Sequence, residues 1–161
     1  MGPIRKFATL AAIVSSFCAC SAQDEGAGPD NAGPCPDAES PDGCGVIALV
    51  NQERANAGVP ALRFDPALAR AAQAHAADMV LQNYFDHTSL DGRDFGDRAE
   101  AAGYQGFATG ENIARGQETA AKVMESWMTS AGHRKNILSP DSNEIGVGVE
   151  QRTWVQVFGS H

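Results

Sequence analysis

A short stretch near the C-terminal end, residues 127–138, most constrains how this chain can fold. It begins as the apolar end of an amphipathic helix, and Gly132 is suited to a left-handed cap that would stop the helix there. His133 follows this cap directly, and Pro140 excludes any further helix. We therefore expect an imidazole at a helix end, either as a positioned functional side chain or as part of a solvated polar turn.

Length and charge bound the class of protein. A chain of 161 residues is expected to hold one domain, and we expect a monomer. Its 20 acidic and 12 basic residues give a net charge of -8, which argues against nucleic acid as a partner because phosphate binding needs a basic face. No apolar run reaches the roughly 18 residues of a membrane-spanning helix. Contact with a membrane is therefore expected only through a lipid anchor.

The first 19 residues read as a signal peptide of the lipoprotein type. Arg5 and Lys6 form a short positive region, and residues 7–17 form an apolar core. Cys20 would then be lipidated and become the mature N-terminus, although the residue three before it is aromatic rather than aliphatic. The alternative is ordinary cleavage, for instance after Ala22. The protein is expected to be exported, and either anchored to the cell envelope by lipid or freely secreted.

Residues 20–44 read as a flexible acidic tether that leads to a folded domain at 45–161. From residue 21 to residue 44 there is no Lys or Arg, and the segment is rich in Gly, Pro, Ala and Ser. Cys35 and Cys44 are expected to form a disulfide in an oxidising compartment. Such a bridge would contribute about 2.5–3 kcal/mol in the chain-entropy model. Two free thiols, or a metal site, are the alternatives.

The spacing of apolar residues in the folded part predicts the order helix, helix, short helix, strand, helix, strand, strand. The expected helices span 45–56, 65–83, 94–102 and 118–131, and the expected strands span 107–114, 145–149 and 154–158. Residues 59–62 are expected to be extended. Helices and a small, mainly antiparallel sheet would segregate into layers, which is an α+β fold.

Three polar residues stand out within these elements. His75 lies on the apolar stripe of the helix at 65–83, where a half-buried histidine with satisfied hydrogen bonds is the simpler interpretation and a functional role the alternative. His87 lies in a loop that follows two aromatic residues. Glu111 stands between Gly110 and Asn112 beside an apolar flank, so its carboxylate is expected to be held in place.

Short motifs along the folded part resemble a known family. They are LVNQER at 49–54, AHAADM at 74–79, FDHTS at 85–89, GENIA at 110–114, GHRKNIL at 132–138 and IGVG at 145–148. In this order they resemble the bacterial branch of the CAP superfamily, which contains cysteine-rich secretory proteins, antigen 5 and plant pathogenesis-related proteins. The resemblance spans residues 46–160.

The resemblance implies a three-layer α-β-α sandwich with a cleft lined by two histidines and two glutamates. His87 and His133 match the family histidines, and Glu111 matches the glutamate of the Gly-Glu-Asn motif. The second family glutamate is absent, and Ser130 stands near its expected place. Asn112 is expected beside these residues in the cleft.

Three functions remain open for this cleft. A binding module for a lipid-like ligand or another envelope component is favoured, because eukaryotic relatives are associated with lipids and partner proteins. Alternatively, His87, His133 and Glu111 hold a divalent metal such as zinc and activate water as a hydrolase or protease. A serine nucleophile at Ser130 lacks the usual surrounding motif. The third possibility is that the cluster of His87, Glu111 and His133 is a purely structural network.

Overall fold

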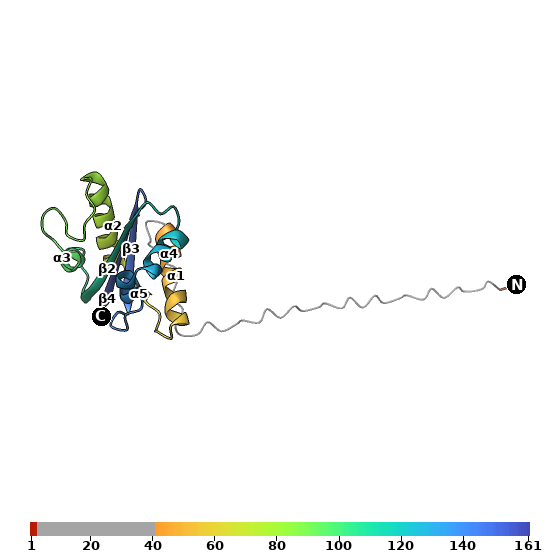
Figure 1. Ribbon diagram of the computed structural model, residues 1–161. Coiled ribbons are helices and arrows are strands. Elements are labelled where there is room, and N and C mark those ends of the chain that lie inside the picture. Colours follow the sequence, from red (N-terminus) through yellow and green to blue (C-terminus); the bar gives the residue numbers. More distant parts are fainter. Residues whose placement is uncertain (3–40) are drawn as a thin grey trace.

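The chain forms three layers, with a sheet between two layers of helices (Figure 1). The structure is a computed structural model that describes residues 1–2 and 41–161. The helices are α1 Pro41–Asn56, α2 Pro66–Leu81, α3 Phe95–Ala101, α4 Ala120–Thr129 and α5 Ala131–Ile137. The strands are β1 Arg63–Phe64, β2 Phe107–Arg115, β3 Glu144–Glu150 and β4 Thr153–Ser160. The predicted α+β sandwich is confirmed.

The sheet has the strand order β1-β3-β4-β2. Strands β3 and β4, and β4 and β2, pair antiparallel, as predicted, whereas β1 pairs parallel with β3. The hairpin between β3 and β4 turns at Gln151 and Arg152, whose φ angles of 43° and 63° suit a two-residue hairpin loop. The short strand β1 was not predicted, because two residues carry no periodic signal. The segment expected to be extended, 59–62, precedes it.

Local capping explains where the helices on one side of the sheet begin. Asp65 accepts a hydrogen bond from the backbone N–H of Leu68 at 2.8 Å, and a proline occupies the first turn of α2. Asp94 and Asp97 form a reciprocal capping box at the start of α3. Gly103 follows that helix with a φ of 88°, as predicted for its end.

The first helix begins at Pro41 rather than at residue 45, inside the segment expected to be the tether. Its first turn packs on the sheet, where Gly43 lies next to Val147 of β3. Cys20 and Cys35 lie outside the described residues, so the lipid anchor, the disulfide with Cys44 and the signal peptide stay predictions. In the described part of the chain no helix combines the length and the apolar character needed to cross a membrane.

The helix predicted over 118–131 is two helices, and the predicted cap at Gly132 is wrong. Helix α4 ends at Thr129, Ser130 adopts an extended conformation with φ -94° and ψ 121°, and α5 starts at the next residue. Gly132 lies inside α5, so His133 is a helical residue and not part of a polar turn. A single extended residue therefore turns the chain, rather than a left-handed glycine.

Arg54 of α1 fixes the position of α5. Its guanidinium is buried and donates to four backbone carbonyl groups, those of Pro60 at 2.6 Å, Ile137 at 2.8 Å, Ser139 at 2.9 Å and Ser142 at 3.1 Å. Two of these carbonyls lie at the C-terminal end of α5, where intrahelical donors are missing. The cation thus satisfies the helix end and ties it to α1.

Candidate functional site

The site is centred on Glu111 of β2, whose two carboxylate oxygens are both engaged. Oε1 lies 2.8 Å from Nδ1 of His87, and Oε2 accepts from Nη2 of Arg98 at 2.6 Å. The side chains of Glu111 and Arg98 are 1% and 5% exposed, whereas that of His87 is 54% exposed. A buried ion pair therefore holds an imidazole that faces solvent.

Arg98 was not identified from the sequence, although it holds this arrangement together. Its Nη1 donates to the hydroxyl of Ser89 at 3.1 Å and to the carbonyl of Arg93 at 2.9 Å, and its Nη2 donates to the carbonyl of His87 at 3.0 Å. The loop between α2 and α3 is therefore folded around one guanidinium. An arginine in a short amphipathic helix gives no sequence signal for this burial, because the loop that covers it is irregular.

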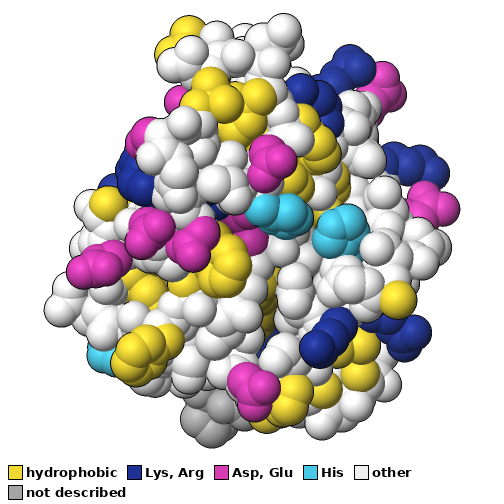
Figure 2. Space-filling view, turned by 60° about the vertical axis from the view of Figure 1, so that its left-hand side comes forward, with side chains coloured by type: hydrophobic (Ala, Val, Ile, Leu, Met, Phe, Trp, Pro, Cys, Tyr) yellow, Lys and Arg dark blue, Asp and Glu magenta, His cyan; other side chains and the backbone are white. Residues whose placement is uncertain are grey.

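His133 lies on α5 and is half-buried. Burial, and then the nearby His87, lower the pKa of His133, whereas the hydrogen bond with Glu111 raises the pKa of His87. Figure 2 shows two histidine side chains next to each other on one face, above a hollowed part of the surface. The structure thus brings together His87, Glu111 and His133, as the resemblance implied.

Asn112 takes part as an internal tie and not as a surface group. It is fully buried, and its Nδ2 donates to the carbonyl of His133 at 3.2 Å and to Oε1 of Gln156 at 3.0 Å. Asn136 of α5 donates to Oδ1 of Asn112 at 2.9 Å and to the backbone carbonyl of Glu111 at 3.0 Å. These amides hold α5 against β2 and so set the place of His133.

Side chains of α4 and α5 cover part of the outer edge of β2. Trp127 of α4 donates from Nε1 to the carbonyl of Ile113 at 3.3 Å, and Asn136 bonds the carbonyl of Glu111 two residues earlier. Because β2 is the last strand of the sheet, these two carbonyls point away from β4. Backbone acceptors beside the site are thereby satisfied.

Ser130 forms the junction between α4 and α5 and is half-buried. It makes no side-chain cap hydrogen bond, and no hydrogen bond links its hydroxyl to the histidines or to Glu111 within residues 41–161. The sequence prediction that Ser130 belongs to the cleft therefore receives no contact to support it.

The donor set does not fit a resident metal ion. In the described part of the chain no three His, Cys, Asp or Glu side chains are arranged to hold one. The reason is that Glu111 already accepts from Arg98, a permanent cation that would repel a second cation at the same carboxylate. His87 and His133 thus lack the third ligand that a zinc site of the predicted type needs.

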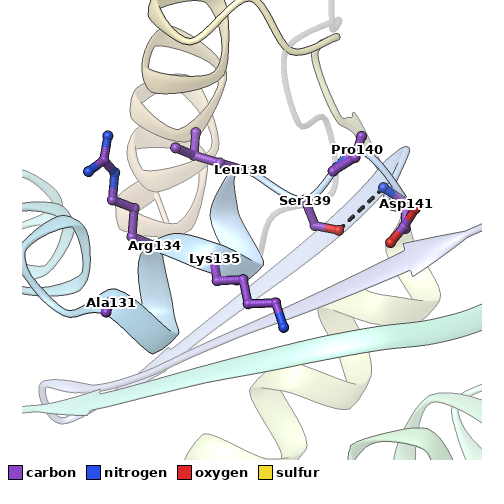
Figure 3. Close-up of a pocket in the computed structure, with 7 residues that line it drawn as sticks. All are labelled: Ala131, Arg134, Lys135, Leu138, Ser139, Pro140 and Asp141. Carbon is purple, nitrogen blue, oxygen red and sulfur yellow. Dashed lines mark hydrogen bonds between the residues drawn. The ribbon is translucent and has the colours of Figure 1, made fainter.

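Two hollows lie beside α5, and Asn136, which bonds the carbonyl of Glu111, lines one of them. The larger, about 490 Å³, is lined by α5 and the chain that follows it (Figure 3), where Arg134 and Lys135 project from the helix in different directions. The smaller, about 190 Å³, lies between the start of β2 and α5. Lys135, Ser139 and Asp141 line both, so the two hollows share one wall.

Comparisons with known proteins agree with the fold. Residues 47–158 match the model of the CAP family, described as the cysteine-rich secretory protein family. The Bacillus subtilis protein YkwD is 44% identical over 115 residues, which are 70% of this chain and 45% of YkwD. An extracellular protein of Bacillus anthracis that contains an SCP domain superposes with a TM-score of 0.72 at 32% identity, covering 74% of this chain and 40% of that one.

A more distant structure shares the fold. An outer surface protein of Borrelia burgdorferi gives a TM-score of 0.66 at 21% identity, over 72% of this chain and 90% of that one. The chain spans less than half the length of the curated relatives it matches.

Proposed function

This chain belongs to the cysteine-rich secretory protein (CAP) family. We propose that it is an exported module that binds a component of the cell envelope through the surface that carries His87 and His133. Export is supported by the signal-like N-terminus and by the extracellular description of the Bacillus anthracis relative. The ligand contacts would come from His87 and His133.

One observation carries this proposal: both oxygens of Glu111 are engaged, while the imidazole that it holds stays exposed. Arg98 and Glu111 are buried and fix one another, so they cannot reach a ligand. They orient His87 through Nδ1 and leave its Nε2 as the atom available for a partner. A preorganised surface imidazole loses little entropy when it forms a hydrogen bond, which favours binding.

A hydrolase is less well supported by the same geometry. Glu111 is buried and both its oxygens are engaged by His87 and Arg98, so this carboxylate cannot serve as the general base of a hydrolase. The donor set does not fit the metal that the hydrolase alternative requires. A purely structural network would explain Arg98 and Glu111, yet it requires no imidazole at the surface.

The test is co-sedimentation of the full chain with two probes, peptidoglycan sacculi and vesicles of phosphatidylglycerol and phosphatidylethanolamine. The variants are His87→Ala and His133→Ala, and His161→Ala is the matched control because its exposed ring lies at the C-terminus. We expect binding to one probe and about a tenfold loss in either variant, the equivalent of one hydrogen bond of about 1.4 kcal/mol.

Thermal unfolding of the same variants separates the alternatives. Unchanged unfolding with lost binding supports the proposal. Lower unfolding temperatures with binding retained would assign the histidines to a structural network. No sedimentation of the unmodified chain with either probe would reject an envelope-binding role.

A further inference from the structure

The smaller of the two hollows beside α5 is a polar groove, and Asn136 of its lining bonds the backbone carbonyl of Glu111. It is formed by β2, α5 and the connection from α5 to β3, and its volume is about 190 Å³. We propose that this groove holds one ring of a sugar chain, so that the envelope component is a glycan. This inference rests on the proposed binding function and names the ligand class for it.

A β-bulge shapes the groove at the start of β2. The pairing of β2 with β4 shifts register between Ala108 and Gly110, so Thr109 leaves the regular ladder. Its hydroxyl lies 2.8 Å from the hydroxyl of the buried Ser142, which also lines the groove. Bulges of this kind redirect a side chain beside functional sites. Here the bulge brings two hydroxyl groups together on the groove surface.

Gly110 keeps the groove open. A Cβ at this position would stand 3.2 Å from Cγ and Oδ1 of Asn136, which also lines the groove. That separation is tighter than ordinary van der Waals contact. The amide of Asn136 is also fixed by its hydrogen bonds to Glu111 and Asn112, so it has little freedom to move aside. A side chain at residue 110 would therefore press on Asn136 and distort the lining of the groove.

The chemistry of the lining matches a ligand that both donates and accepts hydrogen bonds. Thr109, Ser139 and Ser142 contribute hydroxyl groups, which can do either. Lys135 offers an ammonium and Asp141 a carboxylate, and neither side chain forms an ion pair within residues 41–161. A sugar ring carries hydroxyl groups around its edge and can use both kinds of partner at once. Because the charges of Lys135 and Asp141 offset one another, the lining favours neither an inorganic anion nor an acidic peptide.

Apolar surface on two sides suits the carbon-bound faces of neighbouring rings. Phe107, two residues before Thr109, has 83% of its surface exposed. On the other side, Leu138 and Pro140 line the larger hollow, which shares Lys135 with the groove (Figure 3). Exposed aromatic and aliphatic side chains beside convergent polar groups are typical of ligand sites. The arrangement has room for more than one ring.

The experiment is titration of the isotope-labelled full chain with tri-N-acetylchitotriose and with maltotriose, followed by amide shifts in ¹H–¹⁵N NMR spectra. We expect one trisaccharide to shift the amides of Thr109, Asn136 and Ser142. Thr109→Val keeps the shape and removes a hydroxyl, and Asp141→Asn removes the charge. Each should weaken binding about tenfold, as the loss of one hydrogen bond does. Lys122→Ala, at an exposed side chain of α4, is the control.

The outcomes separate this inference from the function on which it rests. The inference is supported if a trisaccharide shifts the groove amides and its affinity falls in Thr109→Val and Asp141→Asn but not in Lys122→Ala. If sacculi still bind the chain while neither trisaccharide shifts these amides, the glycan assignment falls and the envelope-binding function stands. A glutamate-rich peptide that shifts them when the sugars do not would assign the groove to a protein partner and overturn the inference.

Discussion

The two faces of the sheet are packed by opposite means. Under α1, α4 and α5 the core is made of large side chains, among them Trp127, Trp154 and Phe158, which are at most 1% exposed. Under α2 several alanines and two glycines let the helix approach closely, and Gly146 and Gly148 of β3 lie directly beneath the helix backbone. Substitutions that remove side-chain volume should destabilise the first face, and substitutions that add volume should destabilise the second.

This difference bears on the site because the histidine cluster lies where the two layers meet at β2. Arg98 belongs to the layer of α2 and α3, and His133 belongs to α5 on the other side. The relative position of the two histidines therefore depends on both kinds of packing. Perturbing either layer should change the site by a different route.

The largest loss of stability is expected from a larger side chain on the sheet face under α2. In Gly146→Ala the new Cβ would overlap the backbone of Leu68 and Ala69, which cannot move without displacing α2. We expect a loss of more than about 5 kcal/mol of unfolding free energy, enough to abolish a cooperative transition. Circular dichroism with urea and heat measures it. Gly132→Ala, in open space on α5, should instead stabilise by up to about 1 kcal/mol. Similar unfolding of the two variants would refute the close packing.

The next largest loss of stability is expected from removing volume on the face under α1, α4 and α5. Trp127→Ala removes a fully buried indole and the hydrogen bond from its Nε1 to Ile113. The cavity should lower the unfolding free energy by about 3–5 kcal/mol. Urea titration of this variant and of Trp127→Phe, which keeps most of the volume, should rank the two in that order. Equal losses would mean that the hydrogen bond, and not the volume, matters.

A smaller effect is expected at the buried guanidinium that joins α1 to α5. Arg54→Met keeps apolar volume but leaves carbonyl groups without donors, which should lower the unfolding free energy by about 3 kcal/mol. The amide signals of His133 and Asn136 should broaden, because the end of α5 is released. Arg134→Met, exposed on the same helix, is the control. Sharp signals in both variants would show that α5 is held by other contacts.

The smallest effect on stability is expected from a change of pH, and its sign is opposite for His75 and His87. Burial lowers the pKa of His75 on α2, so its contribution to stability is present above the unfolded pKa of about 6.5 and is lost on acidification. The hydrogen bond with Glu111 raises the pKa of His87, so its contribution is present below about 6.5 and is lost as pH rises through the folded pKa.

NMR titration of the two imidazoles measures these shifts directly. His87 should titrate above the ordinary histidine range and His75 below it. In Glu111→Gln the pKa of His87 should fall toward the ordinary value, while His75 should keep a lowered pKa because burial is its main cause. A His87 pKa that does not respond to Glu111→Gln would contradict the role given to the carboxylate.

Features with a local signal were predictable from the sequence. The start of α2 at Asp65, the end of α3 before Gly103 and the hairpin at Gln151 and Arg152 each follow from a few neighbouring residues. His75 is buried with its Nε2 3.0 Å from the carbonyl of Asp86, in line with the expected satisfied histidine. His87, Glu111 and His133 were found through motifs that the family shares.

Features that depend on distant contacts were not predictable. Gly132 has the local character of a helix end, yet α5 continues through it because Arg54 holds the end of that helix and Asn136 ties it to β2. Arg98 is buried only because the loop before α3 wraps around it. Such partners are separated along the sequence and share no periodic pattern, so a single sequence contains no rule that pairs them.

The partly covered edge of β2 has a consequence for the behaviour of the protein in concentrated solution. An open strand edge can pair with the same edge of another molecule and begin a fibril. Trp127 and Asn136 occupy the outward carbonyl groups of Ile113 and Glu111 that an incoming strand would need. Asn136, which helps to place His133, thus also covers part of this edge, so a substitution that frees the edge should lower solubility.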